Sequence, residues 1–182
     1  VEDADFWKHM GLNPWRIPGA ALSNFRSGKK GQGFSTLTMQ LSRLLFLTPE
    51  KTYERKIKEV ILAFQIEKSF TKEEIFTLYC NQVYFGHGNY GVEAASQFFF
   101  GKPARDLTLA EAATIAGLPQ NPSRLSPIES AERVLARRNH VLGRMAEDGV
   151  VSKEDAAQAM AAAVPRLRKP MPILAPHSSD AA

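Results

Sequence analysis

The sequence predicts an all-α fold, and three observations support this. Capping boxes, in which a threonine and a glutamate three residues later close a helix N-terminus, occur at Thr71–Glu74 and Thr108–Glu111. Apolar residues recur at helical spacing, as in Ile57, Ile61 and Phe64. No pair of segments forms a convincing strand pair, and the chain has no internal repeat. Counting the patterns gives about eight to ten helices.

Caps, glycines and prolines set the expected helix boundaries. Thr48 followed by Pro49 predicts a helix start, and Gly149 predicts a helix end. In chain order we expect helices over 35–47, 49–69, from 71 onward, 91–100, 112–118, 130–148 and 152–164. Gly86–Gly91 has the G-x-G-x-x-G spacing of dinucleotide-binding loops. It follows a helical pattern and no parallel sheet is expected, so we interpret it as a tight turn.

Composition narrows the functional classes. The 182 residues carry a net charge of +4, which predicts a modest attraction to anions such as lipid head groups or a phosphorylated substrate. The basic residues are dispersed, unlike those of a nucleic-acid-binding arm, so no nucleic-acid partner is expected. The single cysteine, Cys80, excludes an internal disulfide and a cysteine-based metal site. No apolar run approaches the ~18 residues of a membrane span.

The chain divides into a domain at 1–164 and a proline-rich linker or tail at 165–182. It begins Val1-Glu2-Asp3, without methionine and inside a motif. We therefore expect a piece of a longer protein, with the N-terminus of the domain truncated.

The most suggestive stretch is a predicted helix preceded by a glycine- and lysine-rich run at 28–32. Ser35 and Thr36 lie in the first turn of this helix, Arg43 lies two turns on, and 44–47 is wholly apolar. Because the first amides of a helix are unpaired, this turn suits an anion. The alternative is an ordinary capped helix after a surface loop.

Two charged groups flank this stretch. Residues 1–11 contain three carboxylates, and in a helix Glu2 would share a face with Phe6 and His9. They predict either an acidic helix start or a catalytic carboxylate. Arg55 and Lys56 lie one helical turn before Glu59. They predict either surface ion pairs or a carboxylate held by two cations.

Five motifs, in one order, carry a family resemblance: Glu2–Gly11, Gly33–Leu41, Arg55–Glu59, Tyr79–Val92 and Leu109–Pro122. On these motifs the sequence resembles the peptidoglycan glycosyltransferase domain, glycosyltransferase family 51, of class A penicillin-binding proteins and monofunctional transglycosylases. The resemblance covers nearly the whole chain. It implies a lysozyme-like fold with a head lobe and a smaller, membrane-facing jaw lobe.

The resemblance also implies a function. The expected reaction polymerises lipid II into β-1,4-linked glycan strands, with inversion at the donor carbon and release of undecaprenyl pyrophosphate. The partners would be lipid II, the growing glycan strand and a membrane surface met by Leu44–Leu47. A transpeptidase domain in the parent chain and a place on the extracytoplasmic (periplasmic) face of the bacterial inner or plasma membrane would follow.

By the same resemblance, Glu2 and Glu59 are the expected catalytic carboxylates, with Glu2 as general base toward the acceptor 4-hydroxyl. The expected substrate-binding residues are Asp3, His9, Ser35, Thr36, Gln40, Arg43, Arg55, Lys56 and Asn81. Three positions depart from the family pattern: Arg43 replaces a usual lysine, Leu44 a frequent asparagine and Phe34 a small residue.

No cofactor is required by the sequence. A divalent cation, Mg²⁺ or Mn²⁺, would suit Asp3 or Glu59, since carboxylates and phosphates together bind such ions. Two other functions stay open. The first is a peptidoglycan-cleaving hydrolase or lytic enzyme that uses two carboxylates on a lysozyme-like scaffold. The second is an inactive lipid- or glycan-binding module.

Overall fold

A computed structural model of the chain describes residues 2–12, 35–47 and 52–163. Within these ranges the fold is helical apart from one small hairpin. The α-helices are α2 (Leu37–Phe46), α3 (Tyr53–Ser69), α4 (Lys72–Gln82), α5 (Val92–Phe100), α6 (Leu109–Gly117), α7 (Ala131–Glu147) and α8 (Lys153–Ala161). Two short 3₁₀ turns, η1 (Ala104–Asp106) and η2 (Leu118–Gln120), flank α6. The predicted all-α class is therefore confirmed.

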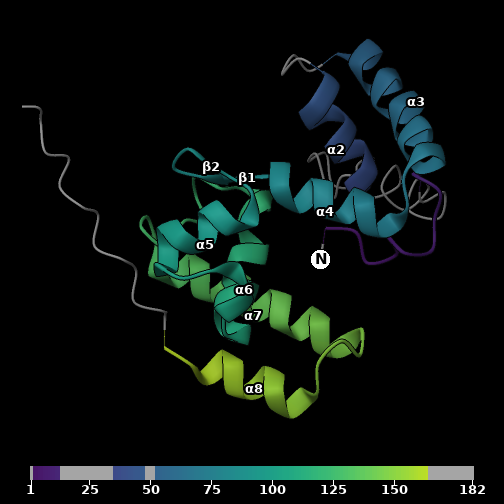
Figure 1. Cartoon of the computed structure of the whole chain (residues 1–182). Coiled ribbons are helices and arrows are strands. Elements are labelled where there is room, and N and C mark those ends of the chain that lie inside the picture. Colours follow the sequence, from purple (N-terminus) through teal and green to yellow (C-terminus); the bar gives the residue numbers. More distant parts are fainter. Residues whose placement is uncertain (1, 13–34, 48–51, 164–182) are drawn as a thin grey trace, which may run out of the picture.

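The helices form two groups joined by α4 (Figure 1). α2 and α3 pack on each other at one end of the molecule, and α4 packs against α2. α5, α6, α7 and α8 form the other group, in which α7 lies between α6 and α8. The main core lies where α2, α4, α5 and α6 meet, and a second cluster of small side chains joins α6, α7 and α8.

Capping residues fix most helix starts where the sequence predicts them. Both predicted capping boxes are present, with Thr71 before α4 and Thr108 before α6. Ser130 and Ser152 cap α7 and α8 through their side chains. At the C-terminal end of α8, the buried guanidinium of Arg138 donates hydrogen bonds to three backbone carbonyls, including that of Met160 at 2.8 Å. Carbonyls in the last turn of a helix have no partner within the helix, so Arg138 supplies one.

The structure differs from the expectations drawn from the sequence in three places. Residues 2–11 form turns held by short backbone bonds such as Phe6 N to Asp3 O, so Glu2 shares no helical face with His9. α3 begins at Tyr53, because Thr52 accepts the Arg55 amide and caps the helix. The predicted start at Pro49 lies outside the described residues.

The third difference is a hairpin where only a turn is expected. β1 (Tyr84–Gly86) pairs antiparallel with β2 (Asn89–Tyr90). The strands, of three and two residues, are too short to show the alternation of apolar and polar residues that marks a strand. The glycines of the turn are therefore the only signal in the sequence. Gly86 and Gly88 both adopt positive φ angles, which confirms the tight turn.

Candidate active site

The N-terminal segment is fastened to α2 by the side chain of Asp3, which is fully buried. Its Oδ2 atom accepts a 3.0 Å hydrogen bond from the backbone amide of Leu37 and a 2.9 Å bond from Nε2 of His9. A carboxylate at a helix N-terminus is stabilised by the dipole and by the unpaired amides there. Asp3 therefore holds its neighbour Glu2 beside the start of α2.

A second anchor joins the same segment to α2. The Thr36 hydroxyl donates a 2.6 Å hydrogen bond to the Gly11 carbonyl and accepts one from the Met39 amide. Gly11 has a φ of +82°, and a Cβ there would lie 3.2 Å from Cγ of Glu67. Only glycine combines this backbone angle with this close packing.

Beneath this segment lies a buried carboxylate network. Oε1 of Glu67, on α3, accepts hydrogen bonds from Thr38 at 2.5 Å and from Lys72 at 2.7 Å. The Lys72 ammonium also lies 4.4 Å from the centre of the Phe6 ring, close enough for a cation–π interaction. The network joins α2, α3 and α4 under the N-terminal segment and fixes the buried Phe6 ring.

Glu2 is paired with a residue far along the chain. Nη2 of Arg137, on α7, lies 3.0 Å from Oε1 of Glu2. Nε of the same guanidinium donates a 3.3 Å hydrogen bond to the Gly117 carbonyl at the end of α6. The predicted base is thus held from both sides, by Asp3 toward α2 and by Arg137 toward α7.

The second predicted catalytic carboxylate, Glu59, is completely buried. Its Oε2 lies 2.8 Å from Nζ of Lys56, and its Oε1 lies 3.5 Å from Nε of Arg55. Lys56 also donates a 2.6 Å hydrogen bond to the Ser35 hydroxyl. The contacts favour the interpretation of a carboxylate held by two cations, because surface pairs would leave Glu59 exposed.

The start of α2 is less open to an anion than the sequence predicts. Asp3 occupies the Leu37 amide, and the Thr36 side chain occupies the Met39 amide. Two first-turn donors are therefore satisfied within the protein. The positive charge that attracts an anion near Ser35 would therefore come mainly from side chains. One of these is Lys56, which already contacts the Ser35 hydroxyl.

Gln40 and Arg43 lie further along α2 and face α4. Oε1 of Gln40 accepts a 3.3 Å hydrogen bond from the Tyr79 hydroxyl. Burial, and then the negative charge of Glu2, raises the pKa of the Tyr79 phenol well above its ordinary value, while Arg43 acts in the opposite direction. The Tyr79 phenol thus stays protonated and can donate a hydrogen bond, and the charges of both Glu2 and Arg43 act on it.

Asn81 has an exposed side chain in the last turn of α4. Its backbone is tightly placed, because a Cβ on Gly91 would lie only 2.7 Å from the Asn81 carbonyl oxygen. The Gly91 amide also donates to the Val83 carbonyl at 2.9 Å. The base of the hairpin therefore fixes where Asn81 lies, while its side chain remains accessible.

A cavity of about 430 Å³ lies beside Glu2 and Asp3. Its other walls are mainly apolar: Phe6 and Trp7 come from the N-terminal segment, and Tyr79 and most of the rest come from α4, α5, α6 and α7. A second cavity of about 490 Å³ is also lined by Asp3 and Trp7. The segment that carries Glu2 thus lies between two hollows.

The sequence predicts the two carboxylates but not several of the residues that contact or support them. Arg137, Glu67 and Lys72 contact or support the site, and nothing in their local patterns marks them. Arg137 is the clearest case, since it lies within an ordinary helical run. Tyr79 is the first residue of the Tyr79–Val92 motif, but the sequence gives no reason to assign it a role. The assignments of catalytic and substrate-binding roles stay predictions.

The residues that could hold a divalent cation are Asp3 and Glu59. Across 2–12, 35–47 and 52–163, one oxygen of each, Oδ1 and Oε1, is buried without a hydrogen-bond partner. No three acidic, histidine or cysteine side chains converge in those same ranges. A cation would thus need ligands from a substrate phosphate as well, and it stays a prediction.

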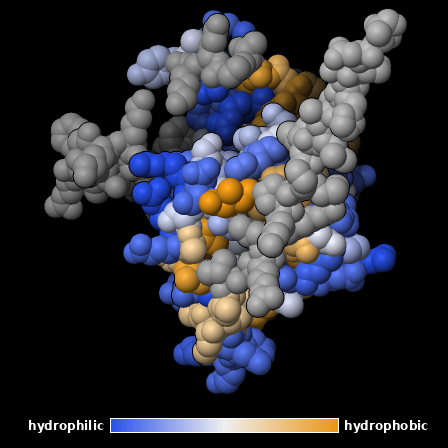
Figure 2. Space-filling view, turned by 90° about the vertical axis from the view of Figure 1, so that its left-hand side faces the viewer, coloured by the Kyte–Doolittle hydropathy of each residue, from blue (hydrophilic) through white to orange (hydrophobic). Residues whose placement is uncertain are grey.

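α2 and α3 also carry an exposed apolar surface, which we call the apolar face. Its members are large hydrophobic side chains with 39–62% of their surface exposed: Leu44, Leu45, Phe46, Ile57, Ile61 and Phe64. Apolar atoms are visible at the level of these helices in the space-filling view (Figure 2). None of the helices in the described ranges has the length and apolar character to span a bilayer.

Comparisons with known proteins place the chain in a family. A sequence model described as Transglycosylase matches residues 1–146. Penicillin-binding protein 1A of Aquifex aeolicus (strain VF5) is 50% identical over 88% of this chain and 22% of its own length. Penicillin-binding protein 1A of Escherichia coli (strain K12) is 48% identical over 90% of this chain and 19% of its own length. The chain therefore spans about a fifth of the length of these relatives.

The fold agrees with a solved structure. The crystal structure of penicillin-binding protein 1A from Haemophilus influenzae matches with a TM-score of 0.51 and 32% identity. The match covers 74% of this chain and 17% of that one. Together with the family match over most of the chain, this shows that the protein belongs to the Transglycosylase family.

Proposed function

We propose that this domain polymerises lipid II, a disaccharide-peptide on undecaprenyl pyrophosphate, into β-1,4-linked glycan strands with inversion at the donor carbon. The observation that carries the proposal is the buried Glu59, whose carboxylate meets Lys56 while Lys56 also reaches Ser35. This arrangement presents a cation beside the first turn of α2, where Asp3 also holds Glu2. Family membership supports the reaction class.

The chemistry divides between a base and a set of cations. Glu2 accepts the proton of the acceptor 4-hydroxyl as its oxygen attacks the anomeric carbon of the donor. The bond between that carbon and the pyrophosphate oxygen breaks, and the pyrophosphate takes the electron pair. Lys56, with Arg55 and Arg43 as further cations, stabilises this growing negative charge. A pyrophosphate leaves as an anion, so no strong general acid is needed.

The test is turnover of lipid II by matched variants. Glu2→Gln and Glu59→Gln should each lower glycan polymerisation by at least a hundredfold, since the first removes the base and the second the partner of Lys56. Asp5→Asn and Glu54→Gln are controls from the same two segments, because both carboxylates are exposed in part and form ion pairs with nearby lysines, Asp5 with Lys8 and Glu54 with Lys58. Normal turnover by folded Glu2→Gln would refute the proposal.

A second substrate separates this function from hydrolysis. Incubation with finished, lipid-free glycan strands should give no cleavage, because such strands carry no pyrophosphate for the cations to stabilise. Cleavage there, with no growth from lipid II, would favour the lytic alternative.

We also propose that the apolar face meets the membrane that carries the lipid substrate, on the extracytoplasmic (periplasmic) side of the bacterial plasma membrane. Six large apolar side chains on two packed helices support this, since contiguous exposed apolar surface marks interaction sites. This chain covers only about a fifth of the length of its relatives. This supports a further domain, such as a transpeptidase, in the parent protein.

A further inference from the structure

The ion pair between Glu2 and Arg137 joins residues 135 positions apart in the chain. The Arg137 side chain is 12% exposed and the Glu2 side chain 27% exposed, so the pair is largely shielded from solvent. Exposed ion pairs contribute little, whereas a shielded pair between a rigid guanidinium and a carboxylate fixes geometry. The contact therefore restricts where the Glu2 carboxylate lies.

Gly117, at the end of the neighbouring helix α6, leaves space for the Arg137 side chain. A Cβ on Gly117 would lie 2.8 Å from Cγ of Arg137, closer than side-chain atoms approach in real proteins. Gly117 has an ordinary helical backbone, with φ −79° and ψ −22°, so the backbone itself does not require glycine. Alanine is the stronger helix former. Space for the arginine stem is the physical reason for glycine here.

The Gly117 carbonyl then completes the arrangement. It accepts a hydrogen bond from Nε of Arg137, which leaves the terminal Nη2 directed at Glu2. One residue of α6 thus provides both the room for the arginine and the acceptor that orients it. The adjacent Arg138 differs, because its guanidinium binds carbonyls at the end of α8 and stabilises the fold there.

We propose that Arg137 is a positioning residue that holds the Glu2 carboxylate for proton transfer, and that glycine is needed at position 117 to leave space for the Arg137 side chain. The inference rests on the proposed function of Glu2 as base. A base displaced by about 1 Å can lose on the order of a hundredfold in rate while substrate binding is kept. Loss of Arg137 should therefore lower kcat rather than raise KM.

The experiment compares Arg137→Met with Arg137→Lys in the protein as encoded, including any sequence that flanks these residues. Methionine keeps an unbranched stem and removes the charge, whereas lysine keeps both the stem and the charge. We expect Arg137→Met to lower kcat for lipid II polymerisation by about 10- to 100-fold, with KM within about twofold. Arg137→Lys should recover part of that loss, and Arg133→Met, an exposed arginine of the same helix, should behave as wild type.

Gly117→Ala gives a second route to the same result. It should lower kcat with Arg137 still present, because the new Cβ displaces the arginine stem. If Arg137→Met and Arg137→Lys lose activity equally, and only in proportion to lost folded protein, Arg137 is a packing residue and the inference fails. Wild-type kcat in both variants would overturn it as well.

A readout without turnover separates this inference from the proposed function. The Leu37 amide is bonded to Asp3, next to Glu2, so its hydrogen-exchange rate reports how firmly the segment is held. We expect faster exchange of this amide in Arg137→Met and unchanged exchange in Arg133→Met. If wild-type protein fails to polymerise lipid II, the proposed function falls, while the exchange rates still decide whether Arg137 positions the segment.

Discussion

Asp3 and Leu37 are joined by a 3.0 Å hydrogen bond from a helix amide to a buried carboxylate, across 34 residues of chain. This one contact brings the N-terminal segment against the first turn of α2. It unites two motifs that are remote in sequence, and Thr36 reinforces it through the Gly11 carbonyl.

Asp3→Asn should destabilise the domain. Oδ2 of Asp3 accepts from both Leu37 and His9, and an amide lacks the charge that strengthens these bonds. We expect the free energy of unfolding, measured by urea denaturation, to fall by about 1–3 kcal/mol. Asp5→Asn, in the same segment, should change it little, because Asp5 pairs with Lys8 at the surface. Equal effects of the two variants would show that the Leu37 contact is unimportant.

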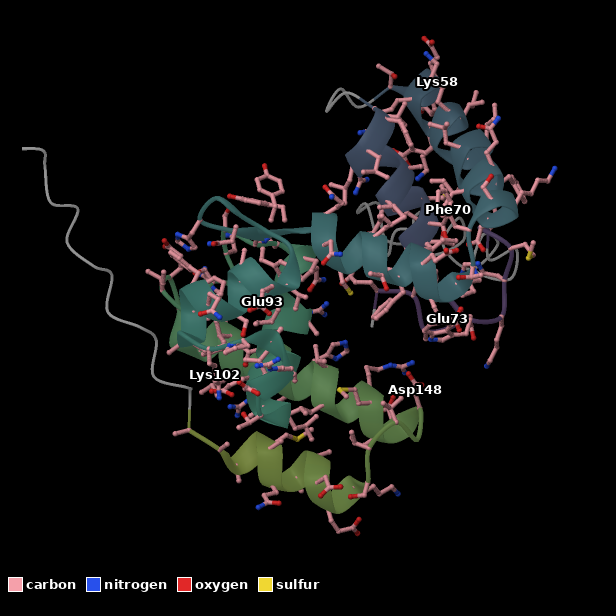
Figure 3. The ribbon with its side chains drawn as sticks, in the orientation of Figure 1. Lys58, Phe70, Glu73, Glu93, Lys102 and Asp148 are labelled. Atoms are coloured by element: carbon pink, nitrogen blue, oxygen red, sulfur yellow. The ribbon has the colours of Figure 1, made fainter. Side chains whose placement is uncertain are left out.

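Lys56→Met should destabilise the domain more than Lys58→Met. Lys56 pairs with a fully buried carboxylate, and its loss would leave Glu59 with the longer Arg55 contact as its remaining ion pair among the described residues. We expect a loss of about 1–3 kcal/mol in the free energy of unfolding. Lys58 pairs with the exposed Glu54 and lies at the outer end of α3 (Figure 3), so its removal should leave unfolding unchanged. Equal denaturation midpoints would contradict this.

Stability at alkaline pH should depend on Tyr79. Its pKa is raised in the folded protein above the ordinary tyrosine value of 10.0, mainly by burial, so the folded state keeps a proton that the unfolded state loses. The resulting stability is present below pH 10 and is lost as pH rises above it, by at most about 1.4 kcal/mol per pH unit. Tyr79→Phe should remove this part of the decline. Urea denaturation of both proteins at pH 7 and pH 11 would show it, since other titrations cancel in the difference.

Two hairpin glycines should respond differently to alanine. Gly91 and Gly88 both have positive φ, of 85° and 78°, so alanine strains the backbone at each. Only at Gly91 would the new Cβ strike another group, the Asn81 carbonyl oxygen at 2.7 Å, whereas nothing lies within 4 Å at Gly88. We expect Gly91→Ala to lower the thermal midpoint clearly more than Gly88→Ala. The reverse order would show that strain alone governs this turn.

Charge on the apolar face should weaken membrane binding. Ile61→Asp places a carboxylate among exposed apolar side chains of α3, and burial of one isoleucine is worth about 1.5–3 kcal/mol. The measurement is co-sedimentation of the 182-residue chain with anionic phospholipid vesicles. We expect the partition coefficient onto the vesicles to fall at least tenfold. Ile128→Asp is the control, because Ile128 is equally apolar and 45% exposed but lies in the loop before α7. Equal losses would mean that the apolar face has no special role.

The sequence determines the helices because capping is local. Thr71 and Thr108 each satisfy the amide three residues on, so four residues specify where α4 and α6 begin. The pairing of Glu59 with Lys56 is also local, since residues one turn apart are neighbours on any helix. The start of α3 is determined less well by the sequence, which marks Thr48 as the cap, whereas the structure shows Thr52 capping the helix.

The tertiary structure alone decides which of these local features form one site. Burial turns the Glu59 pair from a surface contact into a shielded one, and burial depends on how α2 packs on α3. Arg137 is a partner of Glu2 from far along the chain, and Gly117 leaves space for its side chain. Contacts across 135 residues leave no local pattern, since they arise only when packing brings distant helices together. The sequence thus specifies the carboxylates and the cations, and the packing of α6 and α7 determines what holds the first carboxylate in place.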